Sequence, residues 1–368
     1  MKNRNHLLIA LAAPLIFSSP ALAQVKAKQS KPMTKAKQAQ TKNTEETKVA
    51  PPETNQETKE DFNTVNRPGS VDIATEYDLS NLTIPKDQIH TLLPRDAIPA
   101  LIDPELIPLA DATYLNDDDR IIDVTVANGS TVESVAVPLK ILNFHEVSNF
   151  TISGKPIAAT YCPLCDSVTL VSRTVTNADG KTEILEFGVS GALYNSNVLM
   201  YDTAYKSLWS QLGLKAVSGP LAGTDLEHLP VKIVPWSQFK SDHPQGQVIS
   251  INTGHERPYE GNPYQRYFDD QDYIMVPLAT HGNALPKKTL GLGIKATTEE
   301  SDESYFVAAA SVGERFVIKT KLGNVIAVST EAGVQVISAP NSVHTVQSFY
   351  YAFSAFHPNT KVLTESAE

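Results

Sequence analysis

A long succession of short strand-like segments is the feature that most restricts how this chain can fold. After the first third of the sequence, apolar and β-branched runs follow one another, each bounded by turn residues: NVLMYD, SLWSQ, VKIVP, QVISI, YIMVP, TLGLGI, YFVAAAS, ERFVIKT, NVIAVST and GVQVISA. Asn-Gly at 128–129 and Asp-Gly at 179–180 have the pattern of tight hairpin turns. Helical patterns are confined to 138–149, WSQFKSDH and VQSFYYAFSAFH. We therefore predict a β-rich α+β fold, with sandwich-like or open-barrel sheets and a few marginal helices.

The N-terminus has the layout of a secretory signal peptide, which we place at residues 1–23. A basic start with Lys2 and Arg4 precedes an apolar stretch from Leu7 to Phe17, and small residues follow up to Ala23. This apolar stretch is shorter than the ~20 residues of a membrane-spanning helix. We expect an exported protein, periplasmic or secreted, without a transmembrane segment.

Residues 24–61 contain no aromatic side chain and consist mainly of Lys, Gln, Thr, Glu and Pro. Such a composition buries too little apolar surface to order the chain, so we predict a disordered spacer. Its basic first part fits either a solvated tether or an arm that contacts an anionic cell-envelope surface. Residues 62–368 suffice for a single large β-rich domain. The net charge of −10 argues against nucleic acid as a partner.

Two stretches near the end of each half of this domain resemble each other. WSQFKSDHPQGQV and YYAFSAFHPNTKV share aromatic, His-Pro and Val positions. This similarity predicts a pseudo-repeat covering 155–250 and 270–365, with coincidence as the alternative. The same offset pairs Cys-Pro-Leu-Cys at 162–165 with Val-Pro-Leu-Ala at 276–279. We expect His243 and His357, each before a proline, to end their helices.

Cys162 and Cys165 are the only cysteines of the chain. The β-branched run SVTLV follows them closely, which places the pair in a turn between two strands, whereas a thioredoxin-type pair opens a helix. Two thiols on a tight turn can face one metal ion. In an exported protein, a simple disulfide between them is an equally good interpretation.

Two further residues could complete a metal site with these thiols. His145 precedes the strand that leads to Cys162, and Met200 offers a thioether. Two thiolates, an imidazole and a thioether form a soft ligand set, which suits copper or zinc. Taken singly, His145 is equally well explained as a hydrogen-bonded packing residue and Met200 as a core residue.

Several motifs in a fixed order extend from the segment around His145 to Gln211. They are Asn143–Glu146, Thr160–Cys165, Phe187–Gly191, Leu193–Ser196, Met200–Asp202 and Ser207–Gln211. In these motifs the chain resembles the domain-of-unknown-function 3179 family of exported bacterial and archaeal proteins, with Phe144 and Tyr351 where tryptophan is expected. The resemblance implies no established activity. It does imply a shared polar site around the cysteine turn, with the signature positions His145, Glu146, Cys162, Cys165, Asn195, Met200, Asp202 and Trp209.

Three functional hypotheses follow, and the sequence leaves open whether the protein is an enzyme. The first is a copper- or zinc-binding protein, in metal handling or as a metalloenzyme, with Cys162, Cys165, His145 and Met200 as ligands. The second is a thiol–disulfide protein with a structural or redox bond between the two cysteines and no metal. The third is a binding module for a cell-envelope ligand, in which Trp209, Tyr194 and Asn195 line a pocket.

Overall fold

The computed structural model describes residues 72–129, 131–177 and 179–367, which belong to one compact unit, residues 61–368. The predicted signal peptide and spacer, residues 1–23 and 24–61, lie outside the described residues. Within the described ranges, no helix combines the length and the apolar character needed to cross a bilayer.

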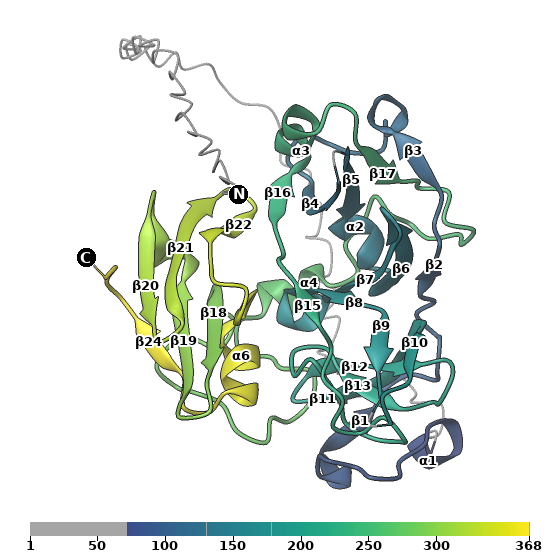
Figure 1. Ribbon diagram of the computed structural model, residues 1–368, viewed down its shortest axis with the longest axis vertical. Coiled ribbons are helices and arrows are strands. Elements are labelled where there is room, and N and C mark those ends of the chain that lie inside the picture. Colours follow the sequence, from purple (N-terminus) through teal and green to yellow (C-terminus); the bar gives the residue numbers. More distant parts are fainter. Residues whose placement is uncertain (1–71, 130, 178, 368) are drawn as a thin grey trace, which may run out of the picture. The chain divides into compact units, whose positions relative to one another are not determined.

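Short strands in small sheets are the main regular structure of the described chain (Figure 1). Three sheets have five strands each, and the first has the strand order β16 (Ile233–Pro235), β4 (Arg120–Asn128), β5 (Thr131–Pro138), β17 (Gln247–Ile249), β3 (Leu106–Pro108). The second has the order β15 (His228–Leu229), β8 (Ser167–Ser172), β7 (Lys155–Cys162), β6 (Val147–Ile152), β2 (Leu101–Ile102). The third has the order β1 (Ile89–Thr91), β11 (Phe187–Tyr194), β12 (Asn197–Asp202), β13 (Leu208–Ser210), β14 (Lys215–Ala216). The smaller sheets are β23 (Val343–Phe349), β18 (Leu290–Thr297), β19 (Asp302–Ala308), β24 (Lys361–Leu363); β20 (Phe316–Thr320), β21 (Gly323–Thr330), β22 (Gly333–Ser338); and β10 (Thr182–Ile184), β9 (Thr174–Thr176). The predicted β-rich α+β class is confirmed.

The helices are few and short. They are α1 (Ile73–Glu76), α2 (Leu139–Leu142), α3 (Trp236–Asp242), α4 (Gln265–Asp269), α5 (Ala309–Val312) and α6 (Tyr350–Phe356), with the 3₁₀ turns η1 (Lys86–Gln88), η2 (Leu109–Asp111) and η3 (Pro163–Cys165). Both predicted hairpins are present, as β4–β5 and β9–β10. Gly129 has φ 61°, a left-handed conformation that glycine adopts without strain and that tight hairpin turns require.

The same order of elements occurs twice along the chain. The first copy is β4, β5, α2, β6, β7, β8, β16, α3, β17 and the second is β18, β19, α5, β20, β21, β22, β23, α6, β24. In each copy a hairpin is followed by a short helix and a three-stranded antiparallel meander. A strand then pairs antiparallel with the first hairpin strand, and the last strand runs parallel to the second. The recurrence covers 120–249 and 290–363, and we call these two ranges the first and the second half. The pseudo-repeat over 155–250 and 270–365 stays a prediction.

The two His-Pro residues end equivalent helices in these halves. His243 closes α3 with φ −130° and ψ 64°, and His357 closes α6 with φ −131° and ψ 75°. The backbone N–H of each histidine donates to the carbonyl of a phenylalanine four residues earlier. The predicted helix ends are therefore confirmed, and the sequence similarity reflects the same local structure.

One predicted helix was largely wrong. The helix expected over 138–149 covers only Leu139–Leu142, and β6 begins at Val147. Glu146 adopts φ 56° between them, which ends any helical path. Asn149, the last residue of the predicted helix, lies in β6 and donates to the carbonyls of Leu101 and Phe187. Pairing of β6 with β7 and β2 outweighs the local helical preference.

The other corrections concern the second half. YIMVP, residues 273–277, forms no strand, so the Val-Pro-Leu-Ala segment at 276–279 is no counterpart of the cysteine turn. The topological counterpart of that turn is the β21–β22 connection. VQSF, expected at the start of the last helix, instead ends β23, and α6 begins at Tyr350.

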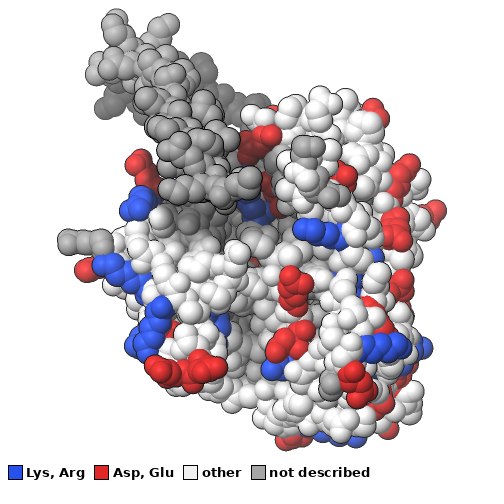
Figure 2. Space-filling view, viewed as in Figure 1, with Lys and Arg blue, Asp and Glu red and all other residues white. Residues whose placement is uncertain are grey.

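The largest buried hydrophobic cluster joins the two halves around the cysteines. It contains Cys162 and Cys165, side chains of β11–β13, and aromatic residues of β23 and α6. A second cluster lies between the first two five-stranded sheets, and a third lies within the second half. On the face of the described residues seen in Figure 2, acidic and basic side chains are interspersed over the surface.

Candidate functional site

The cysteine pair forms the turn of the β7–β8 hairpin, as predicted. Cys162 ends β7 opposite Ser167, and Pro163 opens the 3₁₀ turn η3 that carries Cys165. Asp166 closes the turn with φ 43°. Both cysteines are free and almost completely buried, with exposed fractions of 1% and 0%.

A second hairpin turn meets the cysteine turn. Asn195 and Ser196, between β11 and β12, have φ 52° and 58°, the pattern of a type I′ turn. The Cys165 thiol donates to the Ser196 carbonyl at 3.2 Å, and Asn197 Nδ2 donates to Cys165 Sγ at 3.5 Å. The Tyr351 hydroxyl lies 3.6 Å from the same sulfur and donates to the Leu164 carbonyl. Cys165 is therefore surrounded by polar groups although it is inaccessible to water.

Cys162 has a different environment from Cys165. Burial raises the pKa of the Cys162 thiol well above its usual range, helped by Cys165 and by the charge of Glu146. A hydrogen bond with the backbone of Val198 acts in the opposite direction on this pKa. Without a bound cation, Cys162 is therefore a neutral thiol at neutral pH.

Glu146 is a buried carboxyl near this thiol. Its Oε1 accepts a hydrogen bond from the Tyr264 hydroxyl at 3.1 Å. Burial raises the pKa of Glu146 to about 7, and the hydrogen bond from Tyr264 opposes that rise. Glu146 therefore changes its charge near neutral pH inside the protein.

His145 is directed to other partners than the thiols. Nδ1 donates to the Pro99 carbonyl at 2.7 Å, and Nε2 accepts from the Tyr259 hydroxyl at 2.6 Å. Burial lowers the pKa of His145 to about 4, so the ring is neutral at pH 7. Both ring nitrogens are occupied, which leaves no lone pair for a metal in this conformation.

The remaining signature residues have mainly structural contacts. Trp209 is fully buried, and its Nε1 donates to Asp202 Oδ2 at 2.9 Å. Asp202 also accepts from the backbone amides of Tyr205 and Ser207. Met200 pairs with Trp209 across β12–β13 and is fully buried in the same hydrophobic cluster as the cysteines. Among the described residues, no three His, Cys, Asp or Glu side chains come together as a metal site.

The third hypothesis assigned Trp209, Tyr194 and Asn195 to a ligand pocket. Buried Trp209 has no free face, and Tyr194 packs edge-on against Phe356. Asn195 Oδ1 accepts from the Ala279 amide, and its Nδ2 donates to the Ala355 carbonyl. The three side chains thus hold the fold together at this place.

A long connection between β17 and β18 covers this region, and we call residues 250–289 the strap. Only the short α4 interrupts it, and loops of this length are usually functional. Its contacts are these: Tyr259 to His145, Tyr264 to Glu146, Tyr267 to Tyr351 at 3.1 Å, and Ala279 to Asn195. The strap thus contacts His145, one of the predicted metal ligands, and the signature residues Glu146 and Asn195.

The strap tyrosines were missed in the sequence. A signal was present, because Tyr259, Tyr264, Tyr267 and Tyr273 are concentrated in a chain with only 7% aromatic residues. A group of aromatic residues in an otherwise polar loop indicates a segment that packs onto the domain.

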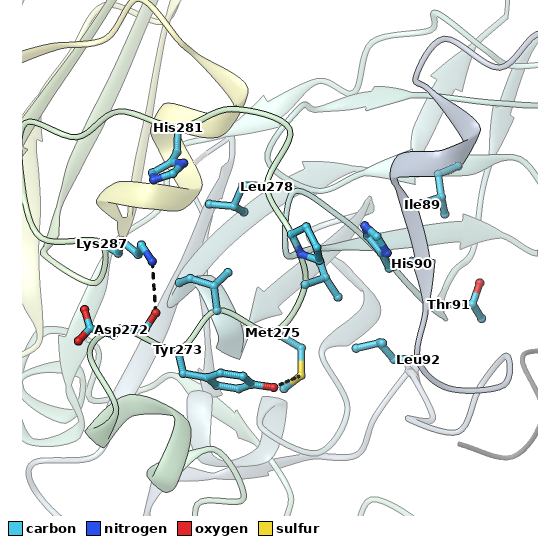
Figure 3. A pocket seen from close by; sticks show the side chains of 13 residues that line it. Ile89, His90, Thr91, Leu92, Asp272, Tyr273, Met275, Leu278, His281 and Lys287 are labelled. Atoms are coloured by element: carbon cyan, nitrogen blue, oxygen red, sulfur yellow. Dashed lines mark hydrogen bonds between the residues drawn. The ribbon is translucent and has the colours of Figure 1, made fainter. Parts of the chain in front are cut away.

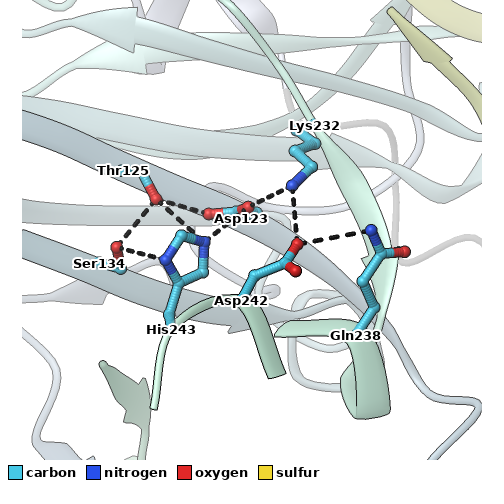
Figure 4. Close-up of polar contacts among 7 residues, drawn as sticks. All are labelled: Asp123, Thr125, Ser134, Lys232, Gln238, Asp242 and His243. Carbon is cyan, nitrogen blue, oxygen red and sulfur yellow. Dashed lines mark hydrogen bonds and ion pairs between the residues drawn. The ribbon is translucent and has the colours of Figure 1, made fainter. Parts of the chain in front are cut away.

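A polar cluster around His243 lies elsewhere in the first half (Figure 4). His243 Nδ1 lies 3.0 Å from Ser134 Oγ, and Nε2 lies 3.0 Å from Asp123 Oδ2. Lys232 bridges Asp123 and Asp242 at 3.2 Å from each. Ser134, His243 and Asp123 are thus joined in the order of a Ser-His-Asp triad. Thr125 Oγ1 also contacts both Ser134 and Asp123. These contacts join α3 to the β4–β5 hairpin.

Comparisons with known proteins give one result. No curated protein and no solved structure matches the chain. The model of a family described as "Protein of unknown function (DUF3179)" matches residues 95–343. That range covers most of the chain, including the cysteine turn, Glu146 and the whole strap. The chain therefore belongs to the DUF3179 family, as the ordered motifs in its sequence predicted.

Proposed function

We propose that the buried pair Cys162 and Cys165 binds one soft cation, Cu(I), through two thiolates. The observation that carries this proposal is the environment of the two sulfurs. They lie beside each other on one turn, and Asn197 and Val198 supply N–H groups to them. Donors of this kind stabilise metal-bound thiolates and hold them in position.

The choice of cation follows from the number of available ligands. Structural zinc takes four protein ligands, whereas His145 has both nitrogens occupied and, within the described ranges, no third acidic or imidazole ligand joins the pair. Thiolates favour Cu(I) among the first-row ions, and two sulfurs suffice for it. Because Cys162 is a neutral thiol when free, binding releases protons and the affinity rises with pH.

The second candidate is a disulfide between the same cysteines. It is favoured by the contact between the two sulfurs and by the export that the N-terminal sequence predicts, because disulfides persist in oxidising compartments. Complete burial of both sulfurs argues against exchange with a partner protein, since thiol–disulfide exchange needs access for the attacking thiolate.

One experiment separates the two candidates. Full-length protein isolated from its native compartment is assayed for metal content and, after denaturation, for free thiols with and without reductant. We expect about one copper per chain, lost in Cys162→Ser and Cys165→Ser and retained in His145→Gln and Met200→Leu. A quantitative disulfide in metal-free protein that also fails to take up Cu(I) after reduction would refute the metal proposal. Loss of copper in His145→Gln, with the fold intact by circular dichroism, would restore the four-ligand set.

A further inference from the structure

A cavity of about 710 Å³ opens between β1 and the second part of the strap (Figure 3). One wall is formed by Ile89–Leu92, and the other by Asp272–Leu278 with His281 and Lys287. This volume lies within the range of about 300–1,000 Å³ that is typical of small-molecule sites. β1 is an edge strand, bonded on one side to β11.

The cavity carries nitrogen donors whose hydrogen-bonding capacity is unused. Among the described residues, the His90 and His281 rings have no hydrogen-bond or ion-pair partner, and both line the cavity. Lys287 Nζ makes one long contact of 3.4 Å to the backbone carbonyl of Asp272. Asp272 also lines the cavity and contributes one carboxylate. The three nitrogen groups of His90, His281 and Lys287 are the donors that an anion in the cavity could reach.

The remaining lining combines polar residues, Thr91, Asp272 and Tyr273, with an apolar part that the core supports. Leu92, Ile274, Met275 and Leu278 line the cavity and pack against the largest hydrophobic cluster. The Tyr273 hydroxyl donates to Met275 Sδ at 3.7 Å (Figure 3), which orients the thioether within the cavity wall. Apolar groups held by the core keep their position without a ligand, so the cavity is preformed.

We propose that this cavity binds a small carboxylate with an apolar body. The carboxylate accepts hydrogen bonds from Lys287 and His281, with His90 on the opposite wall, and the apolar body lies on Leu92, Met275 and Leu278. Charge-assisted hydrogen bonds to a carboxylate supply the selectivity for an anion. The site is separate from the thiols, and its occupancy does not depend on the metal proposal.

Octanoate is a suitable probe, with 1-octanol as an uncharged molecule of the same chain length. Isothermal titration of the full chain is expected to show saturable 1:1 binding of octanoate, with binding of octanol weaker by about tenfold, or ~1.4 kcal/mol. Lys287→Ala and His281→Ala should each weaken octanoate binding by about three- to tenfold. Lys155→Ala, which removes an exposed lysine of β7 that forms no ion pair within the described part of the chain, should leave octanoate binding unchanged.

Each result of these titrations either supports or overturns the carboxylate site. Equal binding of octanoate and octanol, or unchanged octanoate binding in both cavity variants, would overturn the proposal. So would the absence of saturable binding in the wild-type protein. The same titration in Cys162→Ser should match the wild type, which separates this site from the thiol site.

Discussion

The two halves of the domain carry equivalent turns with opposite properties. In the first half, the β7–β8 turn spans Pro163–Asp166, is buried and carries Cys165, and Cys162 is the last residue of β7 before it. In the second half, β21 and β22 are joined by Glu331 and Ala332 alone, and Glu331 is exposed. Side chains from β12 and α6 contact the first turn, and strap Tyr267 lies in the same buried cluster as the two cysteines. The comparison teaches that the repeated strands supply a common scaffold, and that only the longer turn of the first half brings two buried thiols together.

The acidic residues of these two turns give the sharpest test of that difference. Asp166 accepts from Arg120 Nη1 at 2.9 and 3.1 Å and from the Tyr161 hydroxyl at 3.0 Å. Asp166→Ala leaves Arg120 without its counter-charge, so we expect a loss of about 3–5 kcal/mol in the free energy of unfolding. Glu331→Ala should cost less than about 0.5 kcal/mol. Urea denaturation of both variants measures this, and similar losses would mean that the two turns are equivalent after all.

Glu146 in the first half and His357 in the second should make contributions of opposite sign to the pH dependence of stability. The pKa of Glu146 is raised by burial to about 7, so its contribution is present below pH ~4.5 and is lost as the pH rises through 7. Relative to Glu146→Gln, the wild type should therefore lose on the order of 3 kcal/mol between pH 4.5 and 8.

His357 in the second half provides the opposite case. Burial and the charge of Lys295 lower its pKa to about 4. The folded state resists protonation, so stability falls as the pH drops from 6.5 towards 4. Relative to His357→Gln, the wild type should become less stable on acidification. Parallel pH profiles for the two variants would contradict these assignments.

A third difference lies at one position of the first hairpin strand of each half. Asp123 and Gly293 are equivalent positions, because each pairs with the residue two positions before the N-cap of the helix that follows. Asp123 pairs with Ala136 before α2, and Gly293 pairs with Phe306 before α5. A Cβ at Gly293 would lie 2.2 Å from the Phe353 ring. We expect Gly293→Ala to cost about 1–3 kcal/mol by overpacking.

Gly261→Ala is the matched control for this change. Its added Cβ would meet only the Pro258 carbonyl oxygen, at 3.6 Å, so thermal unfolding should hardly change. If Gly293→Ala were equally neutral, the second-half helix α6 would not be packed as closely on β18 as the structure has it.

The smallest expected effect concerns the strap. Tyr264→Phe removes the hydrogen bond to Glu146, worth about 1 kcal/mol, so local opening and labelling of the thiols by a small reagent should become about fivefold faster. Tyr77→Phe is the control, because its buried hydroxyl donates at 2.9 Å to the Ser190 carbonyl in another cluster. Stopped-flow labelling in native buffer gives the two rates. Equal acceleration in both variants would mean that the strap does not control access.

The sequence predicted the cysteine turn, the hairpins and the helix ends well. These features depend on a few neighbouring residues: glycine for positive φ at Gly129, β-branched residues after Cys165, and proline after His243 and His357. The helix expected over 138–149 failed because pairing of β6 with β7 and β2 is a long-range interaction that a local pattern does not contain.

Local sequence thus determined the fold class and the place of the two thiols, since backbone preferences and apolar periodicity act over short distances along the chain. Only the tertiary structure decided which groups meet those thiols. His145 and Glu146 are neighbours in sequence, yet His145 bonds Pro99 and Tyr259 while the Glu146 charge acts on Cys162. The strap that reaches both of them is more than 100 residues further along the chain. Contacts between such distant segments follow from the packing of the whole domain, because burial and hydrogen bonding select partners in space rather than in sequence.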